Sequence, residues 1–499
     1  MDNIITERDS LVKTSSNLSD YAAIEKEKNE ESEYLLKENN LQSNQSCFSI
    51  FINQNQGIIT CIILGTLSVI NITDRYVVGS VLIDIENYFD VTKSTAGLLQ
   101  TFFLLSYMAF STPFGYLGDR INRKYLIIAS IVIWIIATFS GSFTNEKQFH
   151  YFVLSRCLFG VATASFETIS TPILGDRFAN NRKYRTRALI MTCLGPPIGF
   201  GLSYLIGLIS HDWFGTDWRY TLRFTQIILV FVLILTLTCY VEPSRGHHDE
   251  PELKSNSFLN DIKILFQNKT YILMIFCWTC GIGSLGAFSW WSSSIIDYSL
   301  NNFNKVLSMS DIRYYKKFYS ILQVLCGAIG LFLPLKFSNY YHKKFMHNID
   351  CYLLSIGFFL NSFFLYFYLF LIDVNMHLTM ILYSLVIVTF NTCWVIKCNI
   401  FLDIIRPNQR STAIALIICF LHLVGDSISP YWVGLIADEC LNRINYLDRY
   451  AISTLLNCTV ISFYPLVFGS FLAGTCALFM TITFYQDKYN AHLSKSLLN

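Results

Sequence analysis

Six ionisable side chains stand inside stretches of the chain that are otherwise apolar, and their types and spacing offer the most chemistry. They are Asp74, Arg75, Arg156, Glu167, Lys397 and Asp426, with His422 one helical turn before Asp426. A charge near the centre of a lipid bilayer costs roughly 3 kcal/mol on insertion scales, so such residues usually face a cavity and have a partner. These residue types suit anion binding, ion pairing and proton transfer.

Asp74 and Arg75 are adjacent in sequence, so on a helix their side chains point about 100° apart. We expect Arg75 to face a cavity, where it could bind a phosphate or a carboxylate, and Asp74 to tie its helix to another. The alternative is that both pair with neighbouring helices. Arg156 and Glu167 lie roughly 16 Å apart on one helix face, which is too far for a direct pair. Arg156 is assigned a structural role, with a functional one left open.

His422 and Asp426 are at positions i and i+4, where helical side chains can touch. A structural hydrogen bond at the turn of Gly425 and Asp426 is one interpretation, and a proton relay is the other. We assign both residues to the structural polar set.

The composition indicates that most of the chain lies in lipid. Charged residues make up 14% and apolar residues 53%, whereas about a quarter of the residues of a soluble protein are charged. The net charge of +2 gives no reason to expect nucleic-acid binding. The 15 cysteines are scattered through apolar stretches and are interpreted as reduced core residues. Cys277 and Cys280 form a CxxC pair within an uncharged stretch, where helix packing is favoured over a redox or metal pair.

Twelve stretches are long and apolar enough to be spanning helices, each needing roughly 20 residues. Ala451–Gln486 exceeds one span, so its first part is expected to be a loop or an interfacial segment. The other eleven are Gly57–Ile85, Ser94–Gly118, Tyr125–Asn145, Phe149–Asp176, Ala188–Ser210, Phe224–Val241, Thr270–Ile296, Phe318–Leu335, Cys351–Ile372, Leu378–Ile396 and Ser411–Ala437.

The even-numbered connections between these spans hold most of the Lys and Arg, so those connections and both termini are predicted to be cytoplasmic. The first fifty residues contain no span and no signal peptide. Their acidic composition favours disorder. Within them, Glu31 to Leu36 fits an acidic dileucine signal that sorting adaptors read.

The chain is predicted to consist of two repeated halves. Asp176 ends one span before Arg185, and Asp403 ends another before Arg410, at corresponding positions of the two halves. Each arginine could reach the acid or the carbonyls of the neighbouring helix end and form a cytoplasmic latch. The predicted parts are a tail (1–50), a six-helix half (51–241), a linker (242–269), a second six-helix half (270–486) and a tail (487–499).

The connection from Gly115 to Lys124 resembles the gate loop of the major facilitator superfamily. Its two glycines permit close helix approach and a tight turn, and it carries four charged residues. The likeness implies an all-α membrane fold of twelve helices in two pseudo-symmetric halves, with alternating access by rocking of the halves. The residues assigned to gating are Gly115, Gly118, Asp119, Arg120, Arg123, Lys124, Asp176, Arg185, Asp403 and Arg410.

Further strings outside this loop carry a narrower likeness. They are Asn71-Ile-Thr-Asp74-Arg75-Tyr-Val-Val-Gly79, Gly97 to Met108, Trp218 to Arg223, Glu242 to Gly246, Arg410-Ser-Thr-Ala413 and His422 to Tyr431. Together these strings resemble the Spinster family of the superfamily. The resemblance implies transport of sphingoid lipids or lysolipids, often linked to protons, at endolysosomes or the cell surface.

Four positions depart from the Spinster pattern. Thr163 stands where a carboxylate is expected, and Glu167 follows one turn later on nearly the same face. Asn399 replaces an intramembrane aspartate, and Lys397 replaces an apolar residue. Because the two helices concerned line the central cavity in this superfamily, we expect Glu167 and Lys397 to pair in one conformation, with Glu167 the proton-sensitive group. Alternatively, Lys397 extends to the cytoplasmic surface near Asp403.

Aromatic side chains offer apolar walls on two cavity-lining helices of the second half: Phe288, Trp290 and Trp291 in the span Thr270–Ile296, and Trp394 in the span Leu378–Ile396. Packing is their default role. An apolar cavity with one or two cations would suit an amphipathic anion. The substrate or coupling set is therefore Asp74, Arg75, Thr163, Glu167, Trp291, Trp394, Lys397 and Asn399.

The expected function is secondary active transport of a lipid-like or amphipathic molecule, with protons and membrane lipids as further partners. The alternatives are a transporter of a polar nutrient or drug-like solute, or a non-transporting sensor. We expect no enzyme, because the chain holds no histidine-rich cluster, no Gly-x-Ser-x-Gly string and no HExxH string. We also expect no cofactor, no metal site and no nucleic acid, and we expect a monomer in the endolysosomal or plasma membrane.

Overall fold

The computed structural model describes residues 55–178, 184, 187–188, 191–192, 194–214, 217–243, 258–302, 308–342, 348–405, 410–444 and 451–496. The chain forms two compact units, Met1–Ile59 and Thr60–Asn499, and all contacts below belong to the second. The predicted tail 1–50, the adaptor signal from Glu31 to Leu36, and Arg185 lie outside the described residues. So do the side chains of Asp119, Asn399 and Arg410.

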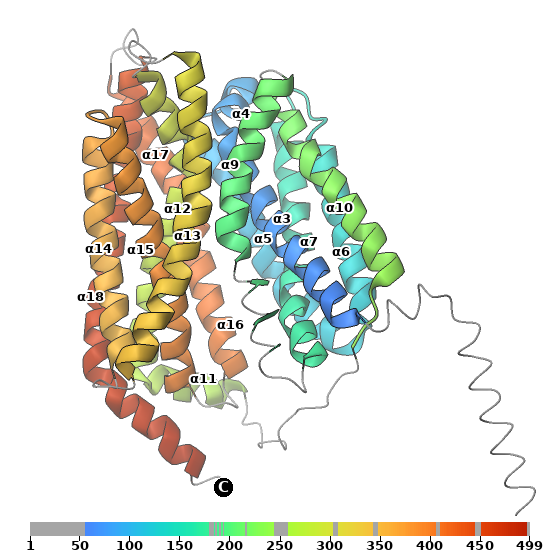
Figure 1. Ribbon diagram of the computed structural model, residues 1–499, viewed down its shortest axis with the longest axis vertical. Coiled ribbons are helices and arrows are strands. Elements are labelled where there is room, and N and C mark those ends of the chain that lie inside the picture. The colour runs from blue at the N-terminus through green and yellow to red at the C-terminus, as the bar shows by residue number, and fades with distance from the viewer. Residues whose placement is uncertain are drawn as a thin grey trace, which may run out of the picture. The chain divides into compact units, whose positions relative to one another are not determined.

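Among the residues that the structure describes, the N-terminal half contains six long helices and one short helix, drawn in blue to green in Figure 1. The short helix α4 (Leu82–Phe89) connects α3 to α5. The long helices are α3 (Gln56–Ser80), α5 (Lys93–Arg120), α6 (Arg123–Gly141), α7 (Phe149–Arg177), α9 (Gly195–Phe214) and α10 (Arg219–Cys239).

The C-terminal half repeats this plan after the short helix α11 (Phe258–Gln267), and Figure 1 shows its helices gathered beside one another in yellow to red. One of its six spans is interrupted and consists of α16 (Arg410–Phe420), a π-helical turn (Leu421–Asp426) and α17 (Ser429–Asn442). The others are α12 (Lys269–Asn302), α13 (Met309–His342), α14 (Ile349–Leu371), α15 (Met376–Ile404) and α18 (Ile452–Ser496).

Length and apolar composition make these helices spanning segments. Ten segments among the described residues are long and apolar enough to cross a membrane. The 28-residue α5 and the shorter apolar helix in α9, Gly195–Ser210, complete the twelve. The predicted all-α membrane fold with two six-helix halves is confirmed.

Short polar side chains begin several helices. The Thr92 side chain accepts from the Thr95 N–H at the start of α5, and Asn122 accepts from the Lys124 N–H at the start of α6. Asn375 does the same at the start of α15. Such caps satisfy N–H groups that have no partner within the helix, so the residues between spans fix where each helix begins.

A π-helical turn shapes the interrupted span. The Ser427 N–H donates to the carbonyl of His422, five residues earlier, at 3.2 Å. The wider turn leaves His422 and Asp426 in contact, with Nδ1 and Oδ1 2.8 Å apart, so the predicted contact is confirmed. Single π turns often mark functional sites.

The expectation of a loop at the start of the last span is wrong, and so is that of reduced thiols for two of the cysteines. The helix α18 begins at Ile452 and continues to Ser496, so the first part of Ala451–Gln486 is helical and the predicted tail continues the helix. Cys440 and Cys458 form a disulfide that joins α17 to α18. Cys440 lies near the end of α17, and Cys458 lies in the first turns of α18. Their Cα atoms are 5.5 Å apart, a separation that a disulfide spans. Cys277 and Cys280 are free thiols.

The backbones of the two halves touch at one end of the helices. We call it the Lys93 end, after the start of α5, and we call the opposite end the Arg123 end, after the start of α6. A Cβ atom added to Gly97 would lie 2.7 Å from the Pro430 carbonyl oxygen, and one added to Gly434 would lie 2.5 Å from that of Lys93. Glycine therefore allows α5 and α17 to touch backbone to backbone.

Candidate functional site

A cavity of about 580 Å³ lies between the two halves. Side chains from α3, α5, α7, α9, α12, α13, α15 and the interrupted span line it. Most of the lining is apolar or aromatic. Five acidic or basic side chains interrupt it: Arg75, Glu167, Lys397, His422 and Asp426.

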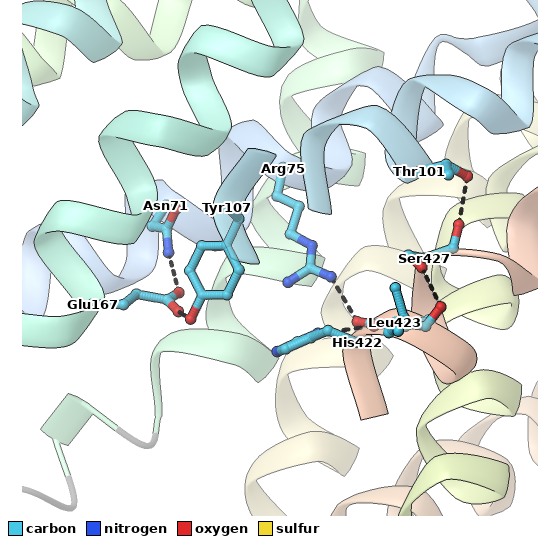
Figure 2. A network of polar contacts seen from close by, with 9 residues as sticks. Asn71, Arg75, Thr101, Tyr107, Glu167, His422, Leu423 and Ser427 are labelled. Atoms are coloured by element: carbon cyan, nitrogen blue, oxygen red, sulfur yellow. Dashed lines mark hydrogen bonds and ion pairs between the residues drawn. The ribbon is translucent and has the colours of Figure 1, made fainter. Parts of the chain in front are cut away.

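Glu167 is held by side chains from two other helices of its half (Figure 2). Asn71 on α3 donates to Oε1 at 2.6 Å, and the Tyr107 hydroxyl on α5 donates to Oε2 at 2.8 Å. The same Asn71 accepts from the Thr163 hydroxyl at 3.1 Å. One amide therefore joins Thr163, at the expected position of the family carboxylate, to the glutamate one turn later.

Arg75 crosses to the other half and binds Asp426. Its Nη2 lies 2.8 Å from Oδ2 of Asp426, whose Oδ1 contacts His422 (Figure 2). The Tyr107 ring packs edge-on against the His422 ring at 5.5 Å between centroids. The predicted orientation of Arg75 toward a cavity agrees with this geometry. Asp426 and His422, assigned to the structural set, line the same cavity and form a link between the halves.

Asp74 serves the interior of the N-terminal half. Its fully buried carboxylate accepts from Trp134 Nε1 at 2.7 Å and from Gln226 Nε2 at 3.0 Å. Arg156 donates to the Asp74 backbone carbonyl at 3.1 Å. These contacts agree with the tie between helices expected for Asp74 and with the structural role assigned to Arg156. Asp74 does not line the cavity in this conformation, so its place in the substrate or coupling set gains no support from this geometry.

Lys397 lies in the cavity wall rather than at the surface. Its Nζ is 4.0 Å from the centre of the Trp278 ring and 3.4 Å from that of Trp394. Asp403, its expected surface partner, binds Lys488 on α18 instead, at 2.5 Å. The pairing of Lys397 with Glu167 stays a prediction, since in this conformation Glu167 is bonded to Asn71 and Tyr107.

Of the four aromatic residues expected to form cavity walls, two line the cavity and two do not. Phe288 and Trp394 line the cavity. Trp291 is fully buried and donates to the Pro430 carbonyl at 3.0 Å, so its assignment to the substrate set is wrong. Trp290 is also fully buried, with its backbone carbonyl facing Gly79. The reason is that α12 turns these neighbouring residues toward α3 and α17 at the Lys93 end.

The loop after α5 ties helix ends together within the N-terminal half. Arg123 is 7% exposed, and its Nη1 lies 2.6 Å from Asp176. Its backbone N–H donates to Glu242 at 3.0 Å. Lys124 Nζ donates to the carbonyls of Leu237 and Tyr240. The acid at the end of α7 thus has Arg123 as its described partner, whereas the latch was expected from Arg185.

The remaining residues of this loop differ in role. A Cβ atom added to Gly118 would lie 2.6 Å from Ile169 Cγ2, which confirms close helix approach there. A Cβ atom added to Gly115 would meet no described atom of another helix within 4 Å, so this conformation shows no close helix approach at that glycine. The Arg120 guanidinium lies over the ring of Tyr116, 3.7 Å from its centre, which keeps it at the surface.

At the Lys93 end, Asp438 of α17 caps the start of α5. Its carboxylate accepts from the backbone N–H groups of Lys93 and Ser94, at 3.1 and 2.8 Å. The Lys93 ammonium lies 3.3 Å from Glu86 and donates to the Tyr298 hydroxyl of α12 at 2.8 Å. Burial raises the pKa of Glu86, and the neighbouring ammonium of Lys93 lowers it less. These contacts join the two halves at the Lys93 end.

Comparisons with known proteins agree with this architecture. Residues 64–430 match the family model of the Major Facilitator Superfamily. The chain is 32% identical over 406 residues to Protein spinster homolog 3 of Danio rerio, covering 80% of each chain. It is 30% identical over 440 residues to Sphingosine-1-phosphate transporter SPNS2 of Xenopus tropicalis, covering 86% of this chain and 82% of the relative.

The chain belongs to the Spinster family of the major facilitator superfamily.

Solved structures carry the same fold. A bacterial homolog of the human lysosomal transporter Spinster, in an inward-facing and unoccupied conformation, superposes with a TM-score of 0.69 at 15% identity, covering 87% of this chain and 98% of that one. A D-xylose-proton symporter superposes with a TM-score of 0.62 at 14% identity, covering 85% and 97%. At such identities the likeness concerns the fold alone. As a Spinster-family chain, the protein is a secondary transporter.

Several residues of this Spinster-family site were missed by reasoning from sequence. Asn71 and Tyr107 stood within matched strings but carried no assigned role. Trp278 was one apolar residue in a long span, with no signal to single it out. Lys93 and Asp438 lie near helix ends, where charges are ordinary, and only the approach of α5 to α17 brings them together.

Proposed function

We propose that this chain moves an amphiphile with an anionic head group across the membrane by alternating access. The observation that supports it is a largely apolar cavity that lies between the halves, is closed at the Lys93 end, and carries the cations Arg75 and Lys397 in its wall. Such a cavity suits a ligand with an alkyl chain and one charged group. The relative from Xenopus tropicalis is named for sphingosine 1-phosphate, an amphiphile of this class.

We further propose that the Arg123 end faces the cytoplasm. The distribution of Lys and Arg among the connections supports this orientation. The disulfide between Cys440 and Cys458 lies toward the opposite end, and disulfides persist in oxidising compartments rather than in the cytosol. The conformation is then inward-facing, in an endolysosomal or plasma membrane. Sorting adaptors at Glu31 to Leu36 and a monomeric state complete the proposal.

Glu167 is the residue we propose for proton coupling. Its carboxylate lines the cavity and is linked through Tyr107 to His422 of the opposite half. A change in its protonation would alter the charge that faces Arg75 and Lys397. In the opposite conformation it pairs with Lys397.

Flux in proteoliposomes tests the proposal. Vesicles that hold the purified full-length protein should accumulate sphingosine 1-phosphate faster than empty vesicles, and an inward acid gradient should change the rate. Glu167→Gln should remove the dependence on the gradient. Binding without flux would favour a sensor, and flux of polar solutes alone would favour the nutrient or drug-like alternative. A lipidomic comparison of cells with and without the protein would then identify the cargo.

A further inference from the structure

The ammonium of Lys397 lies between two indole rings in the cavity wall. Lys397 is 7% exposed, and it lines the cavity together with Trp278 and Trp394. An indole face attracts a cation through its ring quadrupole, and the attraction grows when the cation is shielded from water. The rings therefore stabilise the Lys397 ammonium in the cavity wall without neutralising its positive charge.

This charge stands at a different level of the cavity from the pair of Arg75 and Asp426. The helix α12 connects the two levels, because Trp278 contacts Lys397 and Gly286 abuts Asp426, with an added Cβ 2.4 Å from the Asp426 Cβ. The helical rise of 1.5 Å per residue places these positions about 12 Å apart. Trp278 is the closer of the two to the start of α12, so Lys397 lies nearer the Arg123 end.

The level of Arg75 is unfavourable for an incoming anion. Arg75 is bonded to Asp426, and Glu167 lines the same part of the cavity, so one guanidinium stands among two carboxylates. An anion there would have to displace Asp426 from its buried partner and would also meet repulsion from Glu167. At the other level, the Lys397 ammonium lines the cavity and carries three N–H donors, so it can form hydrogen bonds to an anion. Such bonds are short and strong when both groups are charged.

We propose that Lys397 is a specificity-determining residue that binds the anionic head group of the ligand at the Arg123 side of the cavity. Trp278 and Trp394 hold the ammonium in the empty protein and cover the first methylene groups of the ligand chain in the loaded one. This proposal rests on the proposed function and deepens it. According to this proposal, Lys397 alone determines the selectivity between ligands that have the same alkyl chain but head groups of different charge.

Binding to the purified full-length protein in detergent tests the proposal, with sphingosine 1-phosphate and sphingosine as radiolabelled probes that differ by one phosphate. Lys397→Met should weaken binding of sphingosine 1-phosphate by about tenfold or more and change that of sphingosine by less than about twofold. Lys397→Arg should keep most of the selectivity, since it keeps the charge. Lys336→Met, which removes an exposed lysine of α13, is the matched control and should change neither.

Equal weakening of both probes by Lys397→Met would assign the lysine to packing and overturn the proposal, as would unchanged binding of sphingosine 1-phosphate. Trp278→Leu provides a second variant, because loss of the ring should weaken both probes through the chain contacts. If Trp278→Leu bound each probe as tightly as the wild type does, that result would also count against the proposal. Since binding needs no transport, selective loss in Lys397→Met without any flux would reject the proposed function and leave this assignment standing.

Discussion

The carboxylate of Asp438 accepts a hydrogen bond from the backbone N–H of Lys93, although the two residues are 345 positions apart and belong to opposite halves. The second oxygen of the same carboxylate takes the N–H of Ser94. An acid at a helix start satisfies unpaired N–H groups and interacts favourably with the helix dipole. Here the cap comes from another half, so it exists only while the Lys93 end is closed.

Removing this cap should open the Lys93 end more often. Asp438→Ala should cost the closed conformation about 1 kcal/mol, the usual effect of losing a capping side chain. Spin labels at positions 143 and 374, two exposed sites toward this end on opposite halves, should report a larger share of long distances. Glu439→Gln is the control, because Glu439 is exposed and its pair is Arg443 on the same helix. Identical distance distributions in Asp438→Ala and wild type would contradict the closure.

Acidification should favour the closed Lys93 end through Glu86. Burial raises the pKa of Glu86 above its ordinary value of 4.5 in this conformation, and opening would return it toward that value. The closed state therefore binds the proton more tightly, so its advantage grows as the pH falls through the raised pKa and is lost at higher pH. The same spin-label pair should show shorter distances in acid, and Glu86→Gln should remove the dependence. An equal pH response in both proteins would refute the assignment.

Breaking the contact of Arg123 with Asp176 should destabilise the N-terminal half. Hydrogen bonds to charged groups contribute about 1.5–3 kcal/mol, and Asp176 is partly exposed, so we expect Arg123→Gln to lie toward the lower end of that range. Thermal unfolding in detergent should show a lower midpoint. Arg120→Gln, which removes an exposed guanidinium of the same loop, should leave the midpoint nearly unchanged. A midpoint that falls equally in both variants would show that only the overall charge of the loop matters.

The disulfide should be detectable by labelling. Cys440 and Cys458 close an 18-residue separation, and a loop of about this size gives roughly 3 kcal/mol in the chain-entropy account. A maleimide polymer reacting with denatured protein should add two further labels after reduction, and Cys458→Ser should lower the unfolding midpoint. Equal labelling before and after reduction would mean that both thiols are free.

The relationships that could be predicted from the sequence are those between residues of one helix. Asp74 and Arg75 diverge because neighbours on a helix must, and His422 meets Asp426 because their spacing allows it. The partners across the molecule could not be predicted this way. Lys488 binds Asp403, and Asp438 caps α5, because tertiary packing brings distant helix ends together. Trp291 was misplaced because residue type alone does not say which face of α12 borders the cavity.

Glu167 and Lys397 give the last prediction, which concerns how the cavity changes during transport. Both side chains line the cavity from opposite halves, and in this conformation Glu167 accepts from Asn71 and Tyr107 while Lys397 lies over two rings. We expect Glu167 and Lys397 to pair when the Arg123 end closes. Replacing either residue would then remove the charged partner of the other. Flux should then fall sharply in Glu167→Gln and in Lys397→Met, and the double variant should be little worse than either. Coupling energies between contacting residues reach about 0.5–3 kcal/mol, whereas independent effects add. Losses that simply add, measured as flux of sphingosine 1-phosphate in proteoliposomes, would show that the two residues never pair.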